Sequence, residues 1–323
     1  MSLMNSESKQ RRLKAAVVGV GYLGRFHAQK YKAIKNAELV GVYDSNFERC
    51  KEVAAELGVK AFLSLNELVG QVEAATVAAT TSAHFEASKY LLDNGIHLHI
   101  EKPITSTSRE GQTLCELAKK KNLKLQVGHV ERFNPALIAV KEKLKKPLFI
   151  ECHRLASFKP RGVDVNVVLD LMIHDLDMIL HLVQSEPTSV SAVGTPVITK
   201  TYDIANARIE FASGAVANVT ASRVSLQAQR KFRVFQDSQY LSMDFGTGDV
   251  RLMTKTGEWS GEGQPPIDMQ SWNLEKSDAL LAETESFVDA CLNNKPCVVS
   301  GEDGMRALRL AEQILGAIEN RNR

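Results

Sequence analysis

Three side chains, Lys102, Asp170 and His174, have the types and spacing that could remove a proton from an alcohol. Asp170 and His174 are four residues apart, so they would share one face of a helix. There the carboxylate could hold the imidazole in one tautomer and raise its basicity. Lys102 precedes Pro103 at the end of a predicted strand, where it could hydrogen-bond an oxygen that gains negative charge. The competing interpretation is a surface lysine, a capping aspartate and a structural histidine.

A metal site is a further interpretation of the same stretch. His174, Asp175 and Asp177 are possible ligands, but Asp175 directly follows His174 and would point away from it on a helix. His97 and His99 share one face of a predicted strand, where side-chain packing is their commoner role. Because hydride transfer to a nicotinamide needs no ion, we expect no metal.

The stretch AAVVGVGYLGRFHA, from Ala15 to Ala28, predicts a dinucleotide-binding turn. Its first glycine allows a tight turn, the second lets the backbone approach a pyrophosphate, and the third lets the helix pack close to the strand. The phosphates would lie at the N-terminus of the following helix, where unpaired N–H groups favour negative charge. We therefore expect cofactor contacts from Gly19, Gly21, Tyr22, Leu23 and Gly24.

A second apolar strand ends at Asp44, which lies 20 residues after Gly24. This is the spacing expected for an acid that hydrogen-bonds the 2′-hydroxyl of a ribose. Asp44 would repel the 2′-phosphate of NADP, and the following Ser45 and Asn46 offer no cation, so we expect NAD to be preferred. Further cofactor contacts are expected where other strands end, from Thr80, Thr81, His84, Glu101 and Lys102.

The elements that must position these residues change in character near Gly128. Before it, short strands alternate with helices, which predicts an α/β domain with a doubly wound, parallel Rossmann sheet. After it, consecutive strands predict an α+β domain with an open, mainly antiparallel sheet. We expect an NAD(P)-binding domain over residues 1–128 and a domain for substrate binding and oligomerisation over residues 129–323. Local patterns also predict a capping box at Ser64–Glu67, helices at Pro135–Lys145 and Val167–Val183, and a loop at Thr256–Pro266.

In combination, the GVGYLG turn, Asp44, Glu101-Lys102-Pro103 and the Asp170/His174 pair resemble the Gfo/Idh/MocA oxidoreductase family. The resemblance covers nearly the whole chain and implies NAD(P)-dependent oxidation of a sugar or polyol hydroxyl, with the lysine, aspartate and histidine as catalytic residues. The stretch Gly128–Ala136 is similar to members that oxidise the 3-hydroxyl of UDP-N-acetylglucosamine. Cations in the loop Lys159-Pro160-Arg161 could meet a diphosphate. Candidate substrate contacts are therefore His129, Arg132, Asn134 and Arg161.

Composition and charge argue against several other classes of protein. The 323 residues include 40 basic and 38 acidic side chains, a net charge of +2 that indicates no nucleic-acid partner. No apolar run approaches the roughly 20 residues of a membrane helix, and no signal peptide is recognisable. Five cysteines without CxxC spacing fit reduced thiols, so we expect a cytoplasmic protein. The basic cluster Lys9–Lys14 is expected to lie in a solvated tail.

A sheet with helices on one face leaves the other face to be covered, which predicts a homodimer or homotetramer. Two other function classes remain alternatives: a nucleotide-sensing binding protein with a degenerate site, and a methyltransferase with a similar glycine turn. The presence of Lys102, Asp170 and His174 argues against both. If the protein is a dehydrogenase, an inositol or a simple sugar is an alternative substrate to a nucleotide-sugar.

Overall fold

The computed structural model describes residues 11–160 and 165–321, which form two compact units. The first unit comprises residues 11–106, 110–128 and 280–301. The second comprises residues 107–109, 129–160, 165–279 and 302–321. The chain changes unit after Gly128, and residues 280–301 return to the first unit, whereas the sequence predicts one continuous domain over residues 129–323.

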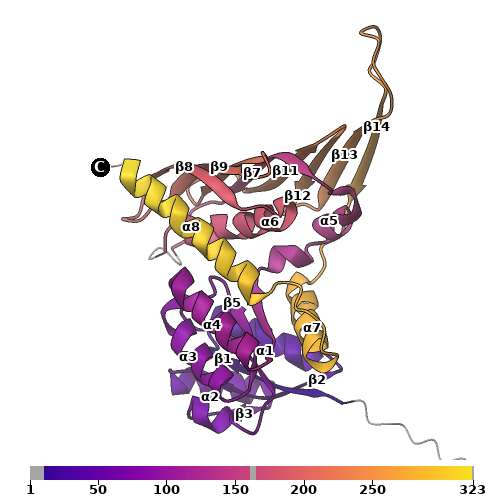
Figure 1. Ribbon diagram of the computed structural model, residues 1–323. Helices are drawn as coiled ribbons and strands as arrows, with labels where there is room; N and C mark the ends of the chain where they lie inside the picture. The colour runs from indigo at the N-terminus through magenta and orange to yellow at the C-terminus, as the bar shows by residue number, and fades with distance from the viewer. Residues whose placement is uncertain (1–10, 161–164, 322–323) are drawn as a thin grey trace, which may run out of the picture. The chain divides into compact units, whose positions relative to one another are not determined.

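The described part of the first unit contains a six-stranded parallel sheet with strand order β3-β2-β1-β4-β5-β6, which confirms the predicted Rossmann fold (Figure 1). The order reverses direction at β1, which pairs with both β2 and β4, and the carboxyl ends of strands at such a point form a ligand crevice. The strands are β1 (Leu13–Val18), β2 (Ala37–Tyr43), β3 (Lys60–Ala61), β4 (Ala74–Val77), β5 (His97–Glu101) and β6 (Leu125–Gly128). The helices are α1 (Tyr22–Ala33), α2 (Phe47–Leu57), the short η1 (Leu65–Leu68), α3 (Thr81–Asp93), α4 (Ser108–Lys120) and α7 (Ala279–Leu292).

The core of the first unit forms around β1, whose residues from Ala15 to Val18 are almost completely buried. Strands in a doubly wound sheet are covered on both faces, which is why this one reads as a continuous apolar run. Phe287 and Val288 of α7 belong to the same core, so α7 packs in the first unit although it lies far along the chain. Ser64 does not cap η1 with its side chain, so the predicted capping box is wrong.

The N-terminal basic cluster is only partly described. Residues 1–10 lie outside the described residues. Arg11 pairs with Glu73, and Arg12 donates to the carbonyl oxygen of Ala37 at 2.6–3.0 Å. These two arginines therefore contact the rest of the first unit while they stay exposed to solvent.

Within its described residues, the second unit contains an eight-stranded sheet with strand order β14-β13-β12-β11-β7-β10-β9-β8 (Figure 1). The sheet is antiparallel, as predicted, except that β7 and β10 run parallel. The strands are β7 (Pro147–Leu155), β8 (Pro187–Thr195), β9 (Ile204–Phe211), β10 (Val216–Ser222), β11 (Gln229–Gln236), β12 (Gln239–Asp244), β13 (Asp249–Lys255) and β14 (Ile267–Asn273). The helices are η2 (Val130–Phe133), α5 (Pro135–Ile138), η3 (Lys141–Lys143), η4 (Val168–Met172), α6 (Ile173–Val183) and α8 (Gly301–Arg321).

Two local predictions for the second unit are corrected. The helix expected over Pro135–Lys145 ends at Ile138 and is followed only by the short η3, although Val140 and Leu144 after it still pack on the core. β14 follows the expected loop and was not predicted, since most of its side chains are exposed and carry no clear alternation of polarity.

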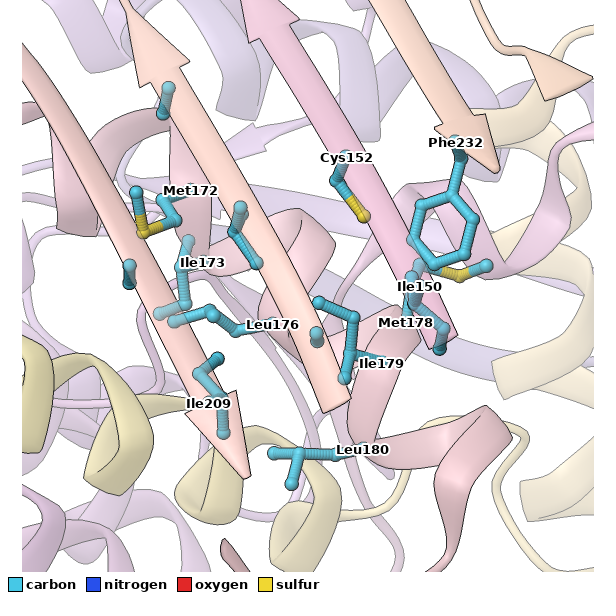
Figure 2. Close-up of a cluster of buried hydrophobic side chains, with 14 of the residues drawn as sticks. Ile150, Cys152, Met172, Ile173, Leu176, Met178, Ile179, Leu180, Ile209 and Phe232 are labelled. Atoms are coloured by element: carbon cyan, nitrogen blue, oxygen red, sulfur yellow. The ribbon is translucent and has the colours of Figure 1, made fainter. Parts of the chain in front are cut away.

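The core of the second unit forms between α6 and the sheet. Ile173, Leu176 and Ile179 of α6 pack with residues of the strands, among them Ile150 and Phe232 (Figure 2). Because α6 is apolar along most of its surface, it is buried nearly all round, and its position is fixed by packing. Among the described residues, no helix has both the length and the apolar content that a membrane span requires.

Candidate active site

The glycine turn of the first unit has the backbone geometry that its sequence predicts. Gly19 has φ = +83°, and a Cβ there would lie 2.5 Å from the backbone nitrogen of Ala79. A Cβ on Gly24 would lie 1.8 Å from the carbonyl oxygen of Gly19, so helix α1 crosses the turn closely. A Cβ on Gly21 would meet nothing within 4 Å. The first and third glycines thus shape the turn, and the second leaves open space where a pyrophosphate could approach.

Asp44 is held at the end of β2 by two backbone N–H groups. Its Oδ2 accepts from Val20 at 2.7 Å and its Oδ1 accepts from Asn46 at 2.8 Å. These bonds tie the carboxylate to the glycine turn and fix its orientation. Arg49 also reaches this turn, where it donates to the carbonyl oxygen of Val20 at 3.1 Å and pairs with Glu52 at 3.5 Å.

A cavity of about 830 Å³ opens beside this turn, at the carboxyl ends of β1, β2 and β4. This volume is within the range of cofactor sites. Tyr22 and Leu23, at the start of α1, are exposed next to it on the chain. The lining includes Gly19, Gly21, Asp44, Thr80, Glu86 and Tyr90. The described residues therefore fit a dinucleotide: open backbone for the pyrophosphate, and a fixed carboxylate for a ribose.

The tripeptide that contains Lys102 is fixed through a buried carboxylate. Glu101 is 8% exposed, and His27 Nε2 donates to its Oε1 at 2.7 Å. Its Oε2 accepts the backbone N–H of Lys102 at 3.2 Å. Burial favours the neutral acid and raises the pKa of Glu101. The His27 hydrogen bond and nearby positive charge outweigh burial and lower this pKa to about 2. The predicted cofactor contact Glu101 is thus an anion that positions Lys102.

His84 is almost completely buried, and it contacts a residue of the cavity wall without lining the cavity itself. Its Nδ1 lies 3.0 Å from the carbonyl oxygen of Pro103, and its Nε2 lies 3.1 Å from that of Ala79, which lines the cavity. Burial lowers the pKa of His84. Thr80 and Thr81, by contrast, stand at the start of α3, and Thr80 faces the cavity directly.

In the second unit, His174 is the second residue of α6 and its ring faces that of His129. The ring centroids are 6.1 Å apart and the ring planes are perpendicular. Asp170 lies in the π-helical turn η4, which differs from the regular α-helix from which a shared face was predicted. Both Asp170 and His174 are partly buried, and partly buried groups can still reach a substrate.

The acids that flank His174 are each held by a buried arginine. Arg132 donates to Asp177 through two nitrogens at 2.6 and 2.8 Å. Arg154 donates to Asp175 at 2.8 and 2.9 Å and to Glu131 at 2.8 Å. These pairs tie η2, β7 and α6 together, and they engage the carboxylates that the metal interpretation required. No group of three metal-ligating side chains is found in residues 11–160 and 165–321.

The structure places the other expected substrate contacts as follows. Arg132 is 6% exposed and bound to Asp177, so it is a structural residue of η2. Asn134 caps α5 by accepting the N–H of Ala136 at 3.0 Å, and it donates to Glu131 at 3.0 Å. Arg161 lies outside the described residues.

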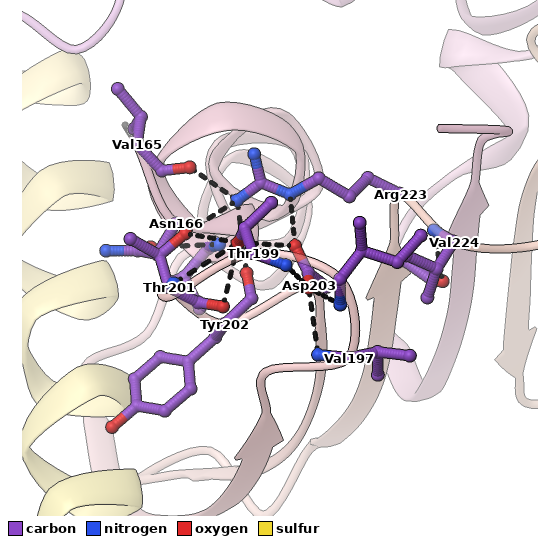
Figure 3. A network of polar contacts seen from close by, with 12 residues as sticks. Val165, Asn166, Val197, Thr199, Thr201, Tyr202, Asp203, Arg223 and Val224 are labelled. Atoms are coloured by element: carbon purple, nitrogen blue, oxygen red, sulfur yellow. Dashed lines mark hydrogen bonds and ion pairs between the residues drawn. The ribbon is translucent and has the colours of Figure 1, made fainter. Parts of the chain in front are cut away.

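Figure 3 shows a polar network that fixes the start of the segment carrying Asp170. Asp203 accepts the backbone N–H groups of residues 197, 198 and 199 at 2.7–2.8 Å and lies 3.3 Å from Arg223 Nε. Arg223 in turn donates to the carbonyl oxygens of Val165 and Tyr202. Sequence reasoning missed both residues, since Asp203 precedes β9 and Arg223 follows β10, far along the chain from the helix that they support.

The fold and the cofactor cavity define a nucleotide-binding protein of the Rossmann class, and comparison with known families places it among oxidoreductases. Residues 13–129 match the model of the oxidoreductase family with an NAD-binding Rossmann fold, GFO_IDH_MocA, and residues 153–241 match the GFO/IDH/MocA C-terminal domain. The chain belongs to the Gfo/Idh/MocA family, as its motifs predicted.

Two relatives span nearly the whole chain. UDP-N-acetylglucosamine 3-dehydrogenase from Acidithiobacillus ferrooxidans is 40% identical over 95% of this chain and 97% of its own length. Its solved structure superposes with a TM-score of 0.89 at 39% identity, covering 96% of this chain and 98% of that chain. Myo-inositol 2-dehydrogenase from Thermotoga maritima is 27% identical over 96% of this chain and 97% of its own length.

Proposed function

We propose that this protein oxidises the 3-hydroxyl of UDP-N-acetylglucosamine, with NAD as the hydride acceptor. The observation that carries the proposal is the 40% identity to a UDP-N-acetylglucosamine 3-dehydrogenase over 95% of the chain. An inositol dehydrogenase is also similar, at 27% identity, and makes a free polyol the second candidate substrate. The fixed carboxylate and open glycine turn of the first unit support the cofactor assignment.

The chemistry assigns one role to each of three side chains. His174 accepts the proton of the substrate hydroxyl, and Asp170 orients the imidazole that receives it. Lys102 supplies a hydrogen-bond donor to a substrate oxygen on which negative charge develops. Bound NAD supplies the electron-deficient carbon that takes up the hydride.

NAD is proposed over NADP on the geometry of Asp44. Its carboxylate faces the cavity while two backbone N–H groups hold it, so a 2′-phosphate would meet a fixed negative charge. Arg49 is the cation that could offset this repulsion, but it already binds the Val20 carbonyl and Glu52.

The test compares three substrates, UDP-N-acetylglucosamine, myo-inositol and glucose 6-phosphate. Formation of NADH is measured with NAD, and formation of NADPH is measured with NADP. The proposal expects turnover with UDP-N-acetylglucosamine and NAD, at the highest kcat/KM of the six pairs. Preferential turnover of myo-inositol would contradict the substrate assignment, and equal or better efficiency with NADP would contradict the cofactor assignment. Tight NAD binding without turnover of any substrate would favour a nucleotide-sensing protein.

We also propose that copies of the chain associate through the sheet of the second unit. Residues of β9 alternate between buried and exposed, so only one face of this strand is covered. Apolar side chains on the strands, including Leu148, Val193, Ile204 and Met269, are 36–63% exposed. Light scattering at micromolar concentration should return a dimer or tetramer mass, and a monomer mass would contradict the proposal.

A cytoplasmic location is part of the same proposal. All five cysteines are free thiols in the described structure, which fits a reducing compartment. Fractionation of cells that express the tagged protein would test this location.

A further inference from the structure

A second cavity, of about 390 Å³, lies in the second unit beside Asn134. Four segments build it: the start of α5, strand β11, the turn between β12 and β13, and the chain between β14 and α7. Its volume lies within the range of small-ligand sites. The lining residues that matter here are Asn134, Arg230, Gly246, Gly248, Lys276 and Ser277.

The wall of this cavity is fixed by backbone contacts. Gly248 has φ = +85°, and a Cβ there would lie only 2.1 Å from the carbonyl oxygen of Leu274. The Leu274 N–H donates to the Gly248 carbonyl at 3.0 Å, and Asp244 accepts the N–H of Gly246 at 2.9 Å. The segment that carries Lys276 is therefore pinned to the turn, and a glycine is required at position 248.

The cavity carries more positive than negative charge. Arg230 and Lys276 both line it, with Glu275 as the one carboxylate among its described lining residues. Arg230 Nη1 is 3.7 Å from Glu131, and Arg154 makes the shorter contact to the same carboxylate, at 2.8 Å. A guanidinium with a nearby ammonium, beside backbone of a glycine-containing turn, suits the oxygens of a phosphate or diphosphate.

The cavity is also connected to the candidate catalytic histidine through a short turn. Asn134, which lines the cavity, donates to Glu131 at 3.0 Å, and both residues belong to the turn that begins after His129. The ring of His129 faces that of His174. This turn therefore joins the residue beside His174 to the wall of the cavity.

We propose that this cavity binds the nucleoside diphosphate part of the substrate, with Arg230 and Lys276 against the diphosphate oxygens. The proposal rests on the proposed function, because it assumes that the sugar is carried by a nucleotide. It assigns the diphosphate to this cavity in place of the basic loop at 159–161.

UDP itself is the probe for the test, titrated by calorimetry into the full-length protein in the presence of NAD. Arg230→Gln and Lys276→Gln should each weaken UDP binding roughly 10- to 100-fold, because each removes a charge-assisted hydrogen bond. Lys231→Gln is the matched control, since Lys231 lies on the same strand but lines a different cavity. In turnover assays, KM for UDP-N-acetylglucosamine should rise more than kcat falls, with KM for NAD and the melting temperature nearly unchanged.

Several results would overturn the cavity assignment. Wild-type UDP affinity in both variants would do so, and so would a loss confined to Arg161→Ala, which would assign the diphosphate to the loop. Absence of UDP binding by the wild type would overturn it as well. The proposed function is judged separately by turnover. If the protein binds UDP through Arg230 but oxidises no nucleotide-sugar, the cavity assignment stands and the proposed reaction is contradicted.

Discussion

Replacing His27 by alanine should destabilise the first unit in a way that depends on pH. His27 is completely buried and holds the Glu101 carboxylate, whose pKa is about 2 against a usual value of 4.5. That difference corresponds to about 3 kcal/mol of stability above pH 5. Leaving a buried carboxylate without its partner typically costs about 3–5 kcal/mol. The two figures agree, so we expect the melting temperature at pH 8 to fall by roughly 6–20 °C.

The sign of the pH dependence follows from the pKa of Glu101. In the wild type it is lower in the folded than in the unfolded state, so the stabilisation is complete above pH 4.5 and is lost as the pH falls toward 2. In His27→Ala, the hydrogen bond that most lowers the pKa of Glu101 is absent. Burial then raises the folded-state pKa of Glu101 above 4.5. The variant then gains stability as the pH falls toward 5, and the difference from the wild type should shrink between pH 8 and pH 5.

Differential scanning calorimetry of both proteins at pH 8 and pH 5 measures this. The space left by the imidazole costs the same at both pH values, but the imidazole itself titrates in this range. Because His27→Ala and His27→Gln both lack the imidazole, the pH dependence of the difference between these two variants isolates Glu101. His27→Gln, which keeps an N–H donor, is the control and should recover much of the loss. An equal difference at both pH values, or a change of less than about 2 °C, would refute the reasoning.

Further predictions concern the cofactor turn and the proposed catalytic residues. Gly24→Ala should abolish NADH binding or the fold of the first unit, measured by fluorescence titration and circular dichroism, because its Cβ would lie 1.8 Å from a carbonyl oxygen. Asp44→Ala should narrow the difference in kcat/KM between NAD and NADP, since the fixed negative charge is removed. His174→Ala and Lys102→Ala should each lower kcat by roughly 10²–10⁴ with NADH binding nearly intact. Asp170→Asn should lower kcat less than His174→Ala, because the base is kept and only its orientation is disturbed.

Controls and contrary outcomes separate these effects from general damage. Gly316→Ala matches Gly24→Ala, since its Cβ would meet nothing within 4 Å and should change little. Unchanged NADH affinity in Gly24→Ala would contradict the turn geometry, and an unchanged cofactor ratio in Asp44→Ala would contradict the role of that acid. Near wild-type kcat with an unaltered pH profile in His174→Ala would make the histidine structural.

Much of the first unit could be predicted from sequence because its signals are local. The glycine spacing, the apolar strand before it and Asp44 after it all lie within 30 residues, and each has a steric or electrostatic reason to be where it is. The alternation of strands and helices then fixes the class of sheet. The helical stretch formed by η4 and α6 was also predictable, since its apolar residues follow a helical period.

The charged residues that support the site could not be predicted in the same way. Arg132 and Asp177 are 45 residues apart, and Arg154 and Asp175 are 21 apart. A single sequence does not show which charged side chains are buried against each other, so Arg132 was assigned to the substrate. His27 lies only three residues after Gly24, yet its partner Glu101 is 74 residues away.

Transfer of the C3 hydrogen tests the central claim most directly. UDP-N-acetylglucosamine labelled with deuterium at C3 would be incubated with the wild-type protein and NAD, and the reduced cofactor analysed by mass spectrometry. The proposed reaction predicts that the deuterium appears in the reduced nicotinamide, at a rate that falls sharply in His174→Ala. Reduced cofactor without deuterium, or no reduced cofactor at all, would contradict it.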